Sequence, residues 1–319
     1  MLNLDPEALR LVELAARAGK PPYEALTPDQ ARQAYAASWD VLQAPTQEVA
    51  SVRDLGIAGP AGELRLRIYR GRGTSDDQRI PCLVFAHGGG WVIGNLQSHD
   101  RLCRRLANAA SSCVVAIDYR LAPEHPYPAG LDDCVAAWRW VHAQADALMV
   151  APDRIGIAGD SAGGNYAAVI ALMGRDGTVP PACHQTLLYP VLDLAAESAS
   201  YRSVAGVPLT AATMRWFIGL YAPDAAARAD WRLSPLRADS LAGVPPTLLF
   251  TAGQDPLRDE GQAYGRRLQE VGVPVLALHA GDQMHGVLMQ GRLVRQANVL
   301  TEMLGTALRA ALRRDHDGG

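Results

Sequence analysis

The chain has 319 residues, of which 49% are hydrophobic and 20% charged, and its formal net charge is −3. This length suits one large α/β unit with an insertion, and the small charge gives no reason to expect nucleic acid or an anionic membrane as a partner. No uncharged apolar run has membrane-spanning length, and the first residues lack the pattern of a signal peptide. We therefore expect a cytoplasmic protein without membrane insertion.

The five cysteines show no spacing typical of a metal site and no C-x-x-C motif. Several of them fall in apolar, strand-like runs, which favours small buried thiols over disulfides. They are Cys82, Cys103, Cys113, Cys134 and Cys183. The sequence thus indicates neither a metal nor a cofactor.

Residues 1–45 have a helical pattern, and Thr27-Pro28-Asp29-Gln30 resembles a helix N-cap with proline at the first helical position. From residue 49 onward, the period of the hydrophobic pattern changes to two residues. The segments 49–54 and 64–69 alternate as half-buried strands do, and they flank a glycine-rich turn. We expect an antiparallel hairpin at the edge of a sheet.

From residue 80 onward, continuous apolar runs alternate with helical segments. The run 80–86 is typical of a strand that is buried on both faces. Further strands are expected at 113–118, 154–158, 185–189, 246–252 and 273–279. Helices are expected at 98–110, 129–145, 161–175, 257–271 and 290–313. This order predicts an α/β fold, with a mainly parallel central sheet and helices on both faces.

The interval between the strands 185–189 and 246–252 is much longer than a crossover needs. We interpret 195–235 as an insertion that covers the carboxyl edge of the sheet, where open α/β folds bind ligands. The sequence is then divided into N-terminal helices (1–45), a first half of the core (46–194), the insertion, and a second half of the core (236–319).

The pentapeptide Gly159-Asp160-Ser161-Ala162-Gly163 stands between the strand 154–158 and a helical segment. In this context G-x-S-x-G is typical of a nucleophile elbow, a tight turn that presents a reactive serine. Only small residues fit beside the serine in such a turn. Because alanine- and glycine-rich chains also produce this pattern by chance, Ser161 needs catalytic partners elsewhere.

His87-Gly88-Gly89-Gly90-Trp91 directly follows the buried strand that ends at Ala86. Consecutive glycines expose their N–H groups and leave room for a substrate oxygen. In lipases and esterases a glycine loop at this place supplies oxyanion-hole donors, together with the N–H that follows the nucleophile. We predict that Gly88, Gly89, Gly90 and Ala162 form an oxyanion hole, without choosing among the three glycines.

The acid of a triad with this elbow lies downstream of the serine and upstream of the histidine. Asp255 fits best, since it follows the strand 246–252 by three residues. Asp193, shortly after the strand 185–189, is the alternative. We predict that Asp255 holds the histidine in the tautomer that accepts the serine proton.

Eight histidines are candidates for the base. His285 falls in the expected loop 281–286 beyond the last strand, which can bring it over the sheet edge toward Ser161. His279 falls inside that strand, and the others lack either the order or the loop context. We therefore predict that His285 activates Ser161 for attack on an acyl carbon.

Five motifs occur in the order known from one family. They are HGGGW (87–91), DYRLAPE (118–124), GDSAGGN (159–165), DPLRDE (255–260) and HG (285–286). The chain resembles the hormone-sensitive-lipase-like branch (bacterial family IV) of the α/β-hydrolase esterases, over about residues 45–300. The resemblance implies a serine carboxylesterase for small esters with short acyl chains, under a helical cap that joins residues 1–45 to the insertion 195–235.

The resemblance also implies that Gly89 and Gly90 donate to the oxyanion, and that residues 273–313 can form the edge of a homodimer. Val287 stands after His285-Gly286 where the family usually has Phe, which we expect to widen the pocket. Tyr166 replaces a small aliphatic residue. Asp118 is expected to hydrogen-bond the glycine loop, and Asp160 to orient the elbow.

Candidate residues for the substrate pocket are aromatic or follow the catalytic histidine, although aromatic residues also serve as core. They are Trp91, Tyr189, Trp216, Phe217 and Val287. Hydrolysis of amides or of another acyl substrate by the same residues is the main alternative function, and a non-catalytic binding module of the same fold is another.

Overall fold

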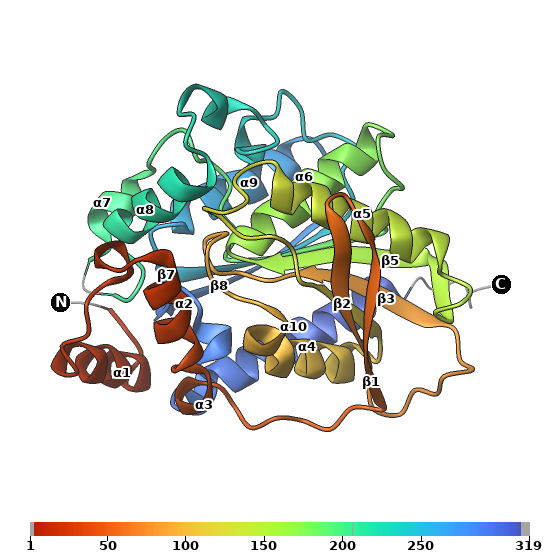
Figure 1. The fold of residues 1–319 in the computed structure, drawn as a ribbon, viewed down its shortest axis with the longest axis horizontal. Helices are drawn as coiled ribbons and strands as arrows, with labels where there is room; N and C mark the ends of the chain where they lie inside the picture. The colour runs from red at the N-terminus through yellow and green to blue at the C-terminus, as the bar shows by residue number, and fades with distance from the viewer. Residues whose placement is uncertain (1–2, 206, 314–319) are drawn as a thin grey trace.

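The structure, a computed structural model, describes residues 3–205 and 207–313. Its centre is an eight-stranded sheet in the order β1-β2-β4-β3-β5-β6-β7-β8 (Figure 1). The strands are β1 (Ser51–Gly59), β2 (Gly62–Arg70), β3 (Ile80–Ala86), β4 (Cys113–Ile117), β5 (Val150–Asp160), β6 (Gln185–Leu188), β7 (Thr247–Gln254) and β8 (Val275–Met284). β2 runs antiparallel to both β1 and β4, and the other five pairs of neighbouring strands in the described residues are parallel, so the prediction of a mainly parallel sheet is confirmed.

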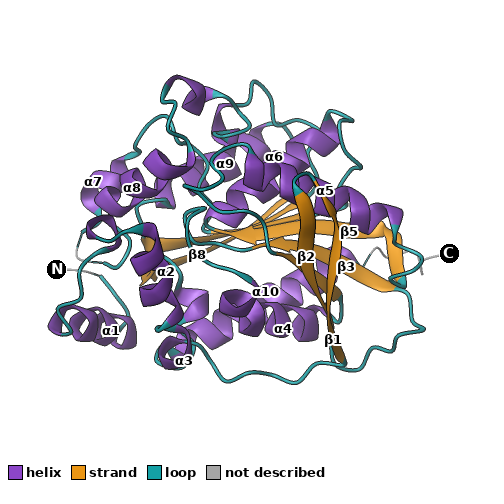
Figure 2. Ribbon diagram, in the orientation of Figure 1, coloured by secondary structure: helices purple, strands orange, loops and turns teal. Residues whose placement is uncertain are grey.

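Helices cover both faces of this sheet (Figure 2). They are α1 (Pro6–Arg17), α2 (Pro28–Ala36), α3 (Trp39–Leu42), α4 (Leu96–Ala110), α5 (Ala129–Ala143), α6 (Ala162–Arg175), α7 (Ala199–Ser203), α8 (Ala211–Tyr221), α9 (Arg258–Glu270) and α10 (Arg295–Leu312). Short 3₁₀ turns are η1 (Tyr23–Ala25), η2 (Ala226–Ala229), η3 (Pro235–Arg237) and η4 (Val287–Met289). The helices α4 and α10 pack on one face, and α5, α6 and α9 pack on the other.

Local sequence explains several of these elements. The helix α2 begins as expected, because Thr27 Oγ1 accepts from the Gln30 N–H at 3.3 Å and Gln30 Oε1 accepts from the Thr27 N–H at 3.0 Å. The strand β3 is buried along almost its whole length, as its continuous apolar run predicts. The hairpin β1–β2 closes between Gly59 and Gly62.

The last strand is longer than its apolar pattern indicates. β8 continues to Met284, which pairs with Gln254 beyond an irregularity in β7. The expected loop 281–286 is therefore strand up to Met284, and His285 is the first residue after it. The last helix begins at Arg295 rather than at 290, because a turn at residues 291–293 follows η4.

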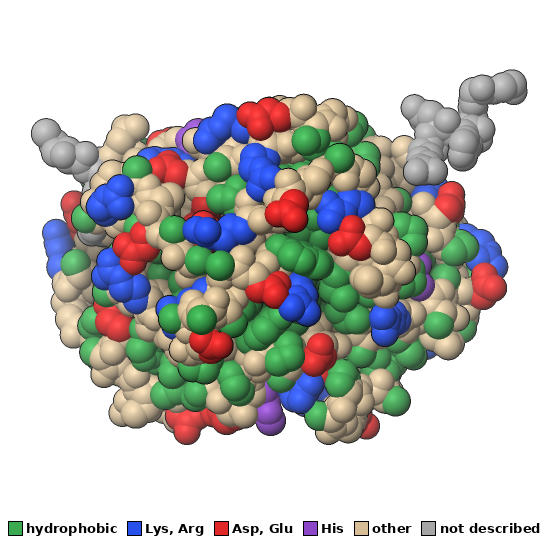
Figure 3. All heavy atoms as spheres, turned by 90° about the horizontal axis from the view of Figure 1, so that it is seen from above, with side chains coloured by type: hydrophobic (Ala, Val, Ile, Leu, Met, Phe, Trp, Pro, Cys, Tyr) green, Lys and Arg blue, Asp and Glu red, His purple; other side chains and the backbone are tan. Residues whose placement is uncertain are grey.

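The surface carries charged side chains of both signs. In Figure 3 acidic and basic side chains are interspersed over the visible face, in keeping with the small net charge. Within 3–205 and 207–313 no helix is long and apolar enough to cross a membrane. In the same ranges no group of three or more His, Cys, Asp or Glu side chains could hold a metal ion.

Candidate active site

Ser161 lies in the tight turn between β5 and α6. Its backbone has φ 54° and ψ −117°, a strained conformation for a residue with a side chain. A Cβ at Gly163 would lie 2.0 Å from the carbonyl oxygen of Ala86, and one at Gly159 would lie 2.2 Å from the carbonyl carbon of Gly163. Both glycines are therefore required by close packing, and the expected elbow geometry is present.

The three residues predicted as a triad meet at the carboxyl edge of the sheet. His285 Nε2 lies 2.9 Å from Ser161 Oγ, and His285 Nδ1 lies 2.7 Å from Asp255 Oδ2. Asp255 is 1% exposed, and its other oxygen accepts from the Leu257 N–H at 2.8 Å. The ring of Tyr189 packs 4.7 Å from that of His285. This geometry permits proton transfer from the serine hydroxyl to the imidazole.

The glycine loop lies beside Ser161, but its three glycines are not equivalent. The Gly88 N–H donates to Asp160 Oδ1 at 2.7 Å, so it is engaged and does not fit the role of an oxyanion donor. Gly89 and Gly90 line the cavity above Ser161, with positive φ angles of 119° and 56°. Within the described residues their N–H groups donate no hydrogen bond. Ala162 is the first residue of α6, where N–H groups have no partner inside the helix.

Asp160 holds this loop in place, in agreement with the orienting role expected from the sequence. Besides the Gly88 N–H, it contacts His99 Nε2, which lies 3.1 Å from Oδ1. Burial raises the pKa of Asp160, but His99 and the Gly88 N–H outweigh it, and the net pKa is below its ordinary value. Asp160 is therefore a buried carboxylate with partners on both sides.

His87 braces the glycine loop through its contacts with Tyr119. Its ring stacks on Tyr119 at 4.2 Å, and the Tyr119 hydroxyl donates to the His87 carbonyl at 2.7 Å. Burial lowers the pKa of His87 to about 3, so the ring is neutral. Asp118 behaves otherwise than expected, because it pairs with Arg65 instead of the glycine loop.

The alternative acid and base lie elsewhere. Asp193 pairs with Arg237 at 2.8 Å and caps the turn at Ala195. His279 Nδ1 lies 2.9 Å from the hydroxyl of Thr251. Among the described residues neither contacts Ser161, so the geometry favours Asp255 and His285.

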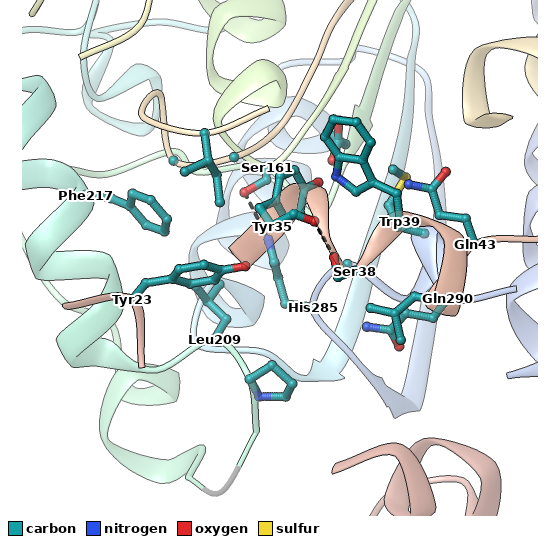
Figure 4. A pocket seen from close by; sticks show the side chains of 18 of the residues that line it. Tyr23, Tyr35, Ser38, Trp39, Gln43, Ser161, Leu209, Phe217, His285 and Gln290 are labelled. Atoms are coloured by element: carbon teal, nitrogen blue, oxygen red, sulfur yellow. Dashed lines mark hydrogen bonds between the residues drawn. The ribbon is translucent and has the colours of Figure 1, made fainter. Parts of the chain in front are cut away.

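A cavity of about 230 Å³ opens directly at Ser161. Its walls come from the N-terminal segment, the glycine loop, the insertion and the residues after β8. The lining residues are Tyr23, Tyr35, Ser38, Trp39, Leu42, Gln43, Gly89, Gly90, Ile93, Asp160, Ser161, Pro208, Leu209, Met214, Phe217, His285, Gly286, Met289 and Gln290. Figure 4 draws 18 of them as sticks and labels ten, among them Ser161 and His285.

Comparison with known proteins agrees with this arrangement. A family model described as alpha/beta hydrolase fold matches residues 83–289. The chain belongs to the α/β-hydrolase family. The similarity of the relatives described below confirms the hormone-sensitive-lipase-like branch.

Two curated relatives of this hydrolase cover most of the chain. It is 44% identical to the carboxylic ester hydrolase LipN of Mycobacterium tuberculosis over 270 residues, which are 82% of this chain and 71% of that protein. It is 36% identical to an ethyl acetate hydrolase of Pseudomonas putida over an alignment of 321 positions, which covers 98% of this chain and 100% of that protein.

Solved structures are similar as well. A thermostable esterase from Pseudomonas putida superposes with a TM-score of 0.93 at 33% identity, and 98% of each chain is covered. An ester hydrolase from the metagenome of Lake Arreo, bound to a derivative of bipyridine phosphonate, superposes with a TM-score of 0.92 at 41% identity. That match covers 96% of this chain and 98% of the other.

Of the five predicted pocket residues, only Phe217 lines the cavity of this hydrolase. Trp91 stacks on Tyr221 at 4.4 Å and belongs to the core. Tyr189 lies behind His285, outside the lining. Trp216 precedes Phe217 on α8, and adjacent helical residues point about 100° apart, so only one of them faces the cavity.

Val287 is fully buried in η4 and packs in the core beneath α10, so it does not line the pocket as expected. Tyr166 is also a core residue, with its ring edge-on to Tyr119 at 5.1 Å. Its hydroxyl occupies the space at Gly130, where a Cβ would lie 2.4 Å away.

The lining residues from the N-terminal segment could not be predicted from the sequence. Tyr23, Tyr35, Trp39 and Gln43 lie more than a hundred residues before Ser161 in the sequence. The helical pattern of residues 1–45 could indicate their element, but no local signal shows which of its faces meets Ser161.

Proposed function

We propose that this hydrolase is a serine carboxylesterase that cleaves small esters with short acyl chains through an acyl-enzyme on Ser161. The observation that carries the proposal is the continuous line of hydrogen bonds from Ser161 through His285 to Asp255 at the floor of a cavity. The similarity to proteins named carboxylic ester hydrolase and ethyl acetate hydrolase supports the ester as substrate.

In the first half of the reaction, His285 Nε2 takes the proton of Ser161 as Oγ attacks the acyl carbon. Asp255 stabilises the imidazolium that forms and keeps Nδ1 protonated. We assign the stabilisation of the oxyanion to the N–H groups of Gly89, Gly90 and Ala162. Ala162 lies at the positive end of α6. His285 then gives its proton to the leaving alcohol.

In the second half, water attacks the acyl carbon on Ser161, and His285 takes a proton from that water. The tetrahedral intermediate collapses, the carboxylic acid leaves, and His285 returns the proton to Ser161 Oγ. No step needs a metal or a cofactor.

We also propose that residues 1–45 and 195–235 together form the cap, with 46–194 and 236–319 as the two halves of the core. In Figure 1 the N-terminal helices lie beside α7 and α8 at one end of the sheet. The rings of Tyr23 and Phe217 are 6.1 Å apart, and the Thr213 hydroxyl donates to Glu24 Oε2 at 2.7 Å. These contacts support one cap built from two distant segments.

A cytoplasmic location and a homodimer are further parts of the proposal. Among the described residues Cys82 and Cys113 form no disulfide, although they lie opposite each other on β3 and β4, which suits a reducing compartment. β8 is the outermost strand of the sheet, and Leu276 on it is 58% exposed. Light scattering on purified protein tests the dimer, and a single-chain mass argues against it.

The direct test of the function is hydrolysis of p-nitrophenyl butyrate by the wild type and by Ser161→Ala. We expect turnover only in the wild type, with both proteins equally folded by circular dichroism. An organophosphate is expected to add once, at Ser161. Activity in the variant, or labelling at another residue, contradicts the assignment, and amide analogues in an acyl-chain series test amidase activity.

A further inference from the structure

The cavity has two chemically different sides. Figure 4 shows Ser161 and His285 in the middle, with Tyr23, Leu209 and Phe217 on one side and Trp39, Gln43 and Gln290 on the other. The first side is mainly hydrocarbon and aromatic, and it also contains Pro208 and Met214. The second side carries amide groups and an indole N–H.

Gln43 is held in a fixed orientation. It is 4% exposed, and its Nε2 donates to the carbonyl oxygen of Ser98 at 2.8 Å. This bond fixes the orientation of the Gln43 amide, because the carbonyl oxygen of Ser98 can accept only from its NH₂ group and not from its oxygen. In the described part of the chain Oε1 accepts no hydrogen bond, so one acceptor remains beside the cavity.

Gln290 is 8% exposed, and its Oε1 is buried without a hydrogen-bond partner in residues 3–205 and 207–313. The Nε1–H of Trp39 is likewise buried without a partner in these ranges. Buried polar groups in proteins are nearly always hydrogen-bonded, because an unpaired one keeps its full desolvation cost. Such groups gathered beside a nucleophile fit a polar group of the substrate.

The side of the cavity formed by Trp39, Gln43 and Gln290 suits an uncharged group of the substrate. The cavity lining contains no lysine or arginine, and its two charged-type side chains, Asp160 and His285, are engaged by His99 and by the triad. Burial raises the pKa of Tyr23 to about 12, so its hydroxyl is neutral as well. A carboxylate on the substrate would enter this cavity without a counter-charge, which is costly.

We infer that Gln43 and Gln290, with Trp39, bind a neutral hydrogen-bonding group such as a carboxamide at one end of the ester, while the side of Phe217 takes a short hydrocarbon. The substrates are then small uncharged esters that are polar at one end. This inference rests on the proposed function, since it names the substrate class of the same site.

The test uses pairs of esters that differ only in a carboxamide or an isopropyl group of the same shape. On the alcohol side the pair is 2-amino-2-oxoethyl butyrate and isobutyl butyrate. On the acyl side it is ethyl succinamate and ethyl 4-methylpentanoate. Rates are measured by pH-stat titration, and each ratio of kcat/KM is divided by the ratio of the alkaline hydrolysis rates.

We expect the wild type to prefer the carboxamide in one of the two pairs by about tenfold or more, because a site with unpaired polar groups rejects an apolar isostere. Gln290→Met and Gln43→Met should each lower that ratio by about fivefold, through the carboxamide ester alone. Gln33→Met, on an exposed position of α2, is the matched control and should keep the wild-type ratio.

Ratios near one in both pairs, or ratios that Gln290→Met leaves unchanged, overturn the inference. Gln43→Met also removes the bond to Ser98, so a loss of fold in it leaves Gln290→Met to decide. Hydrolysis of p-nitrophenyl butyrate is measured for every protein. If the wild type does not hydrolyse it, the proposed function fails too; if it does, only the polar end of the substrate is refuted.

Discussion

Replacing Asp160 with alanine should release the glycine loop without touching the three triad residues. Asp160 is 4% exposed and has two buried partners, the Gly88 N–H at 2.7 Å and His99 Nε2 at 3.1 Å. The variant leaves both partners without a carboxylate, and nothing else in the described structure accepts from the Gly88 N–H.

The expected loss is large for a single substitution. Leaving a buried donor such as the Gly88 N–H without its acceptor costs about 1–3 kcal/mol of the free energy of unfolding, and more where the lost acceptor is charged. Catalysis should fall as well, because Gly89 and Gly90 follow directly on the released residue. Losing one oxyanion donor outright costs about 10²–10³ in kcat, and we expect a loss of up to this size because the loop is displaced but still present.

The free energy of unfolding is measured by urea titration, and kcat by hydrolysis of p-nitrophenyl butyrate at a temperature where the variant is folded. Asp118→Ala is the matched control, since Asp118 also follows a strand but pairs with Arg65, whose side chain is 70% exposed. We expect the control to lose less than about 1 kcal/mol. Equal losses in both variants, or an unchanged kcat in Asp160→Ala, would refute the reasoning.

Two further predictions concern the cap and the N-terminal helices. Gly90→Ala should lower kcat/KM at least about tenfold, because the φ of Gly90 is +56° and a Cβ would lie 2.2 Å from Phe217 Cγ. In steady-state kinetics, adding Phe217→Ala should restore part of the rate. A double variant without any restoration argues against the clash. Bonding to Arg32 lowers the pKa of Glu124 from 4.5 to about 2, so its stabilisation is present above about pH 4.5 and is lost as the pH falls toward 2. In urea titrations Glu124→Gln should flatten stability over that interval, and an unchanged slope would count against the ion pair.

The reactive residues could be predicted because their signals are local. The elbow needs small residues at fixed positions around Ser161, and Asp255 and His285 each follow a strand of a parallel sheet. The carboxyl ends of such strands meet at one edge, so order along the chain is enough to bring these side chains together. Although β8 extends to Met284, its carboxyl end still lies at this edge of the sheet, so His285 still reaches Ser161.

The cavity walls could not be predicted in the same way. They depend on contacts between distant segments, such as the Gln43 carbonyl that accepts from Arg292 Nε at 3.3 Å. They also depend on which of two adjacent aromatic residues on α8 faces inward. An aromatic residue near a motif reads equally well as core or as lining, and Trp91 and Tyr189 became core because they pack against Tyr221 and His285.

The Ser–His–Asp line is carried by β5, β7 and β8, whereas most of the cavity wall is carried by short helices and turns outside the sheet. The residues that cleave the bond and most of the residues that line the cavity therefore lie in different segments of the sequence. Exchange of residues 1–45 or 195–235 between related esterases can therefore change the substrate preference while the catalytic triad stays the same. For an engineer, a chimera that replaces one of these stretches is a shorter route to a new preference than substitution around Ser161.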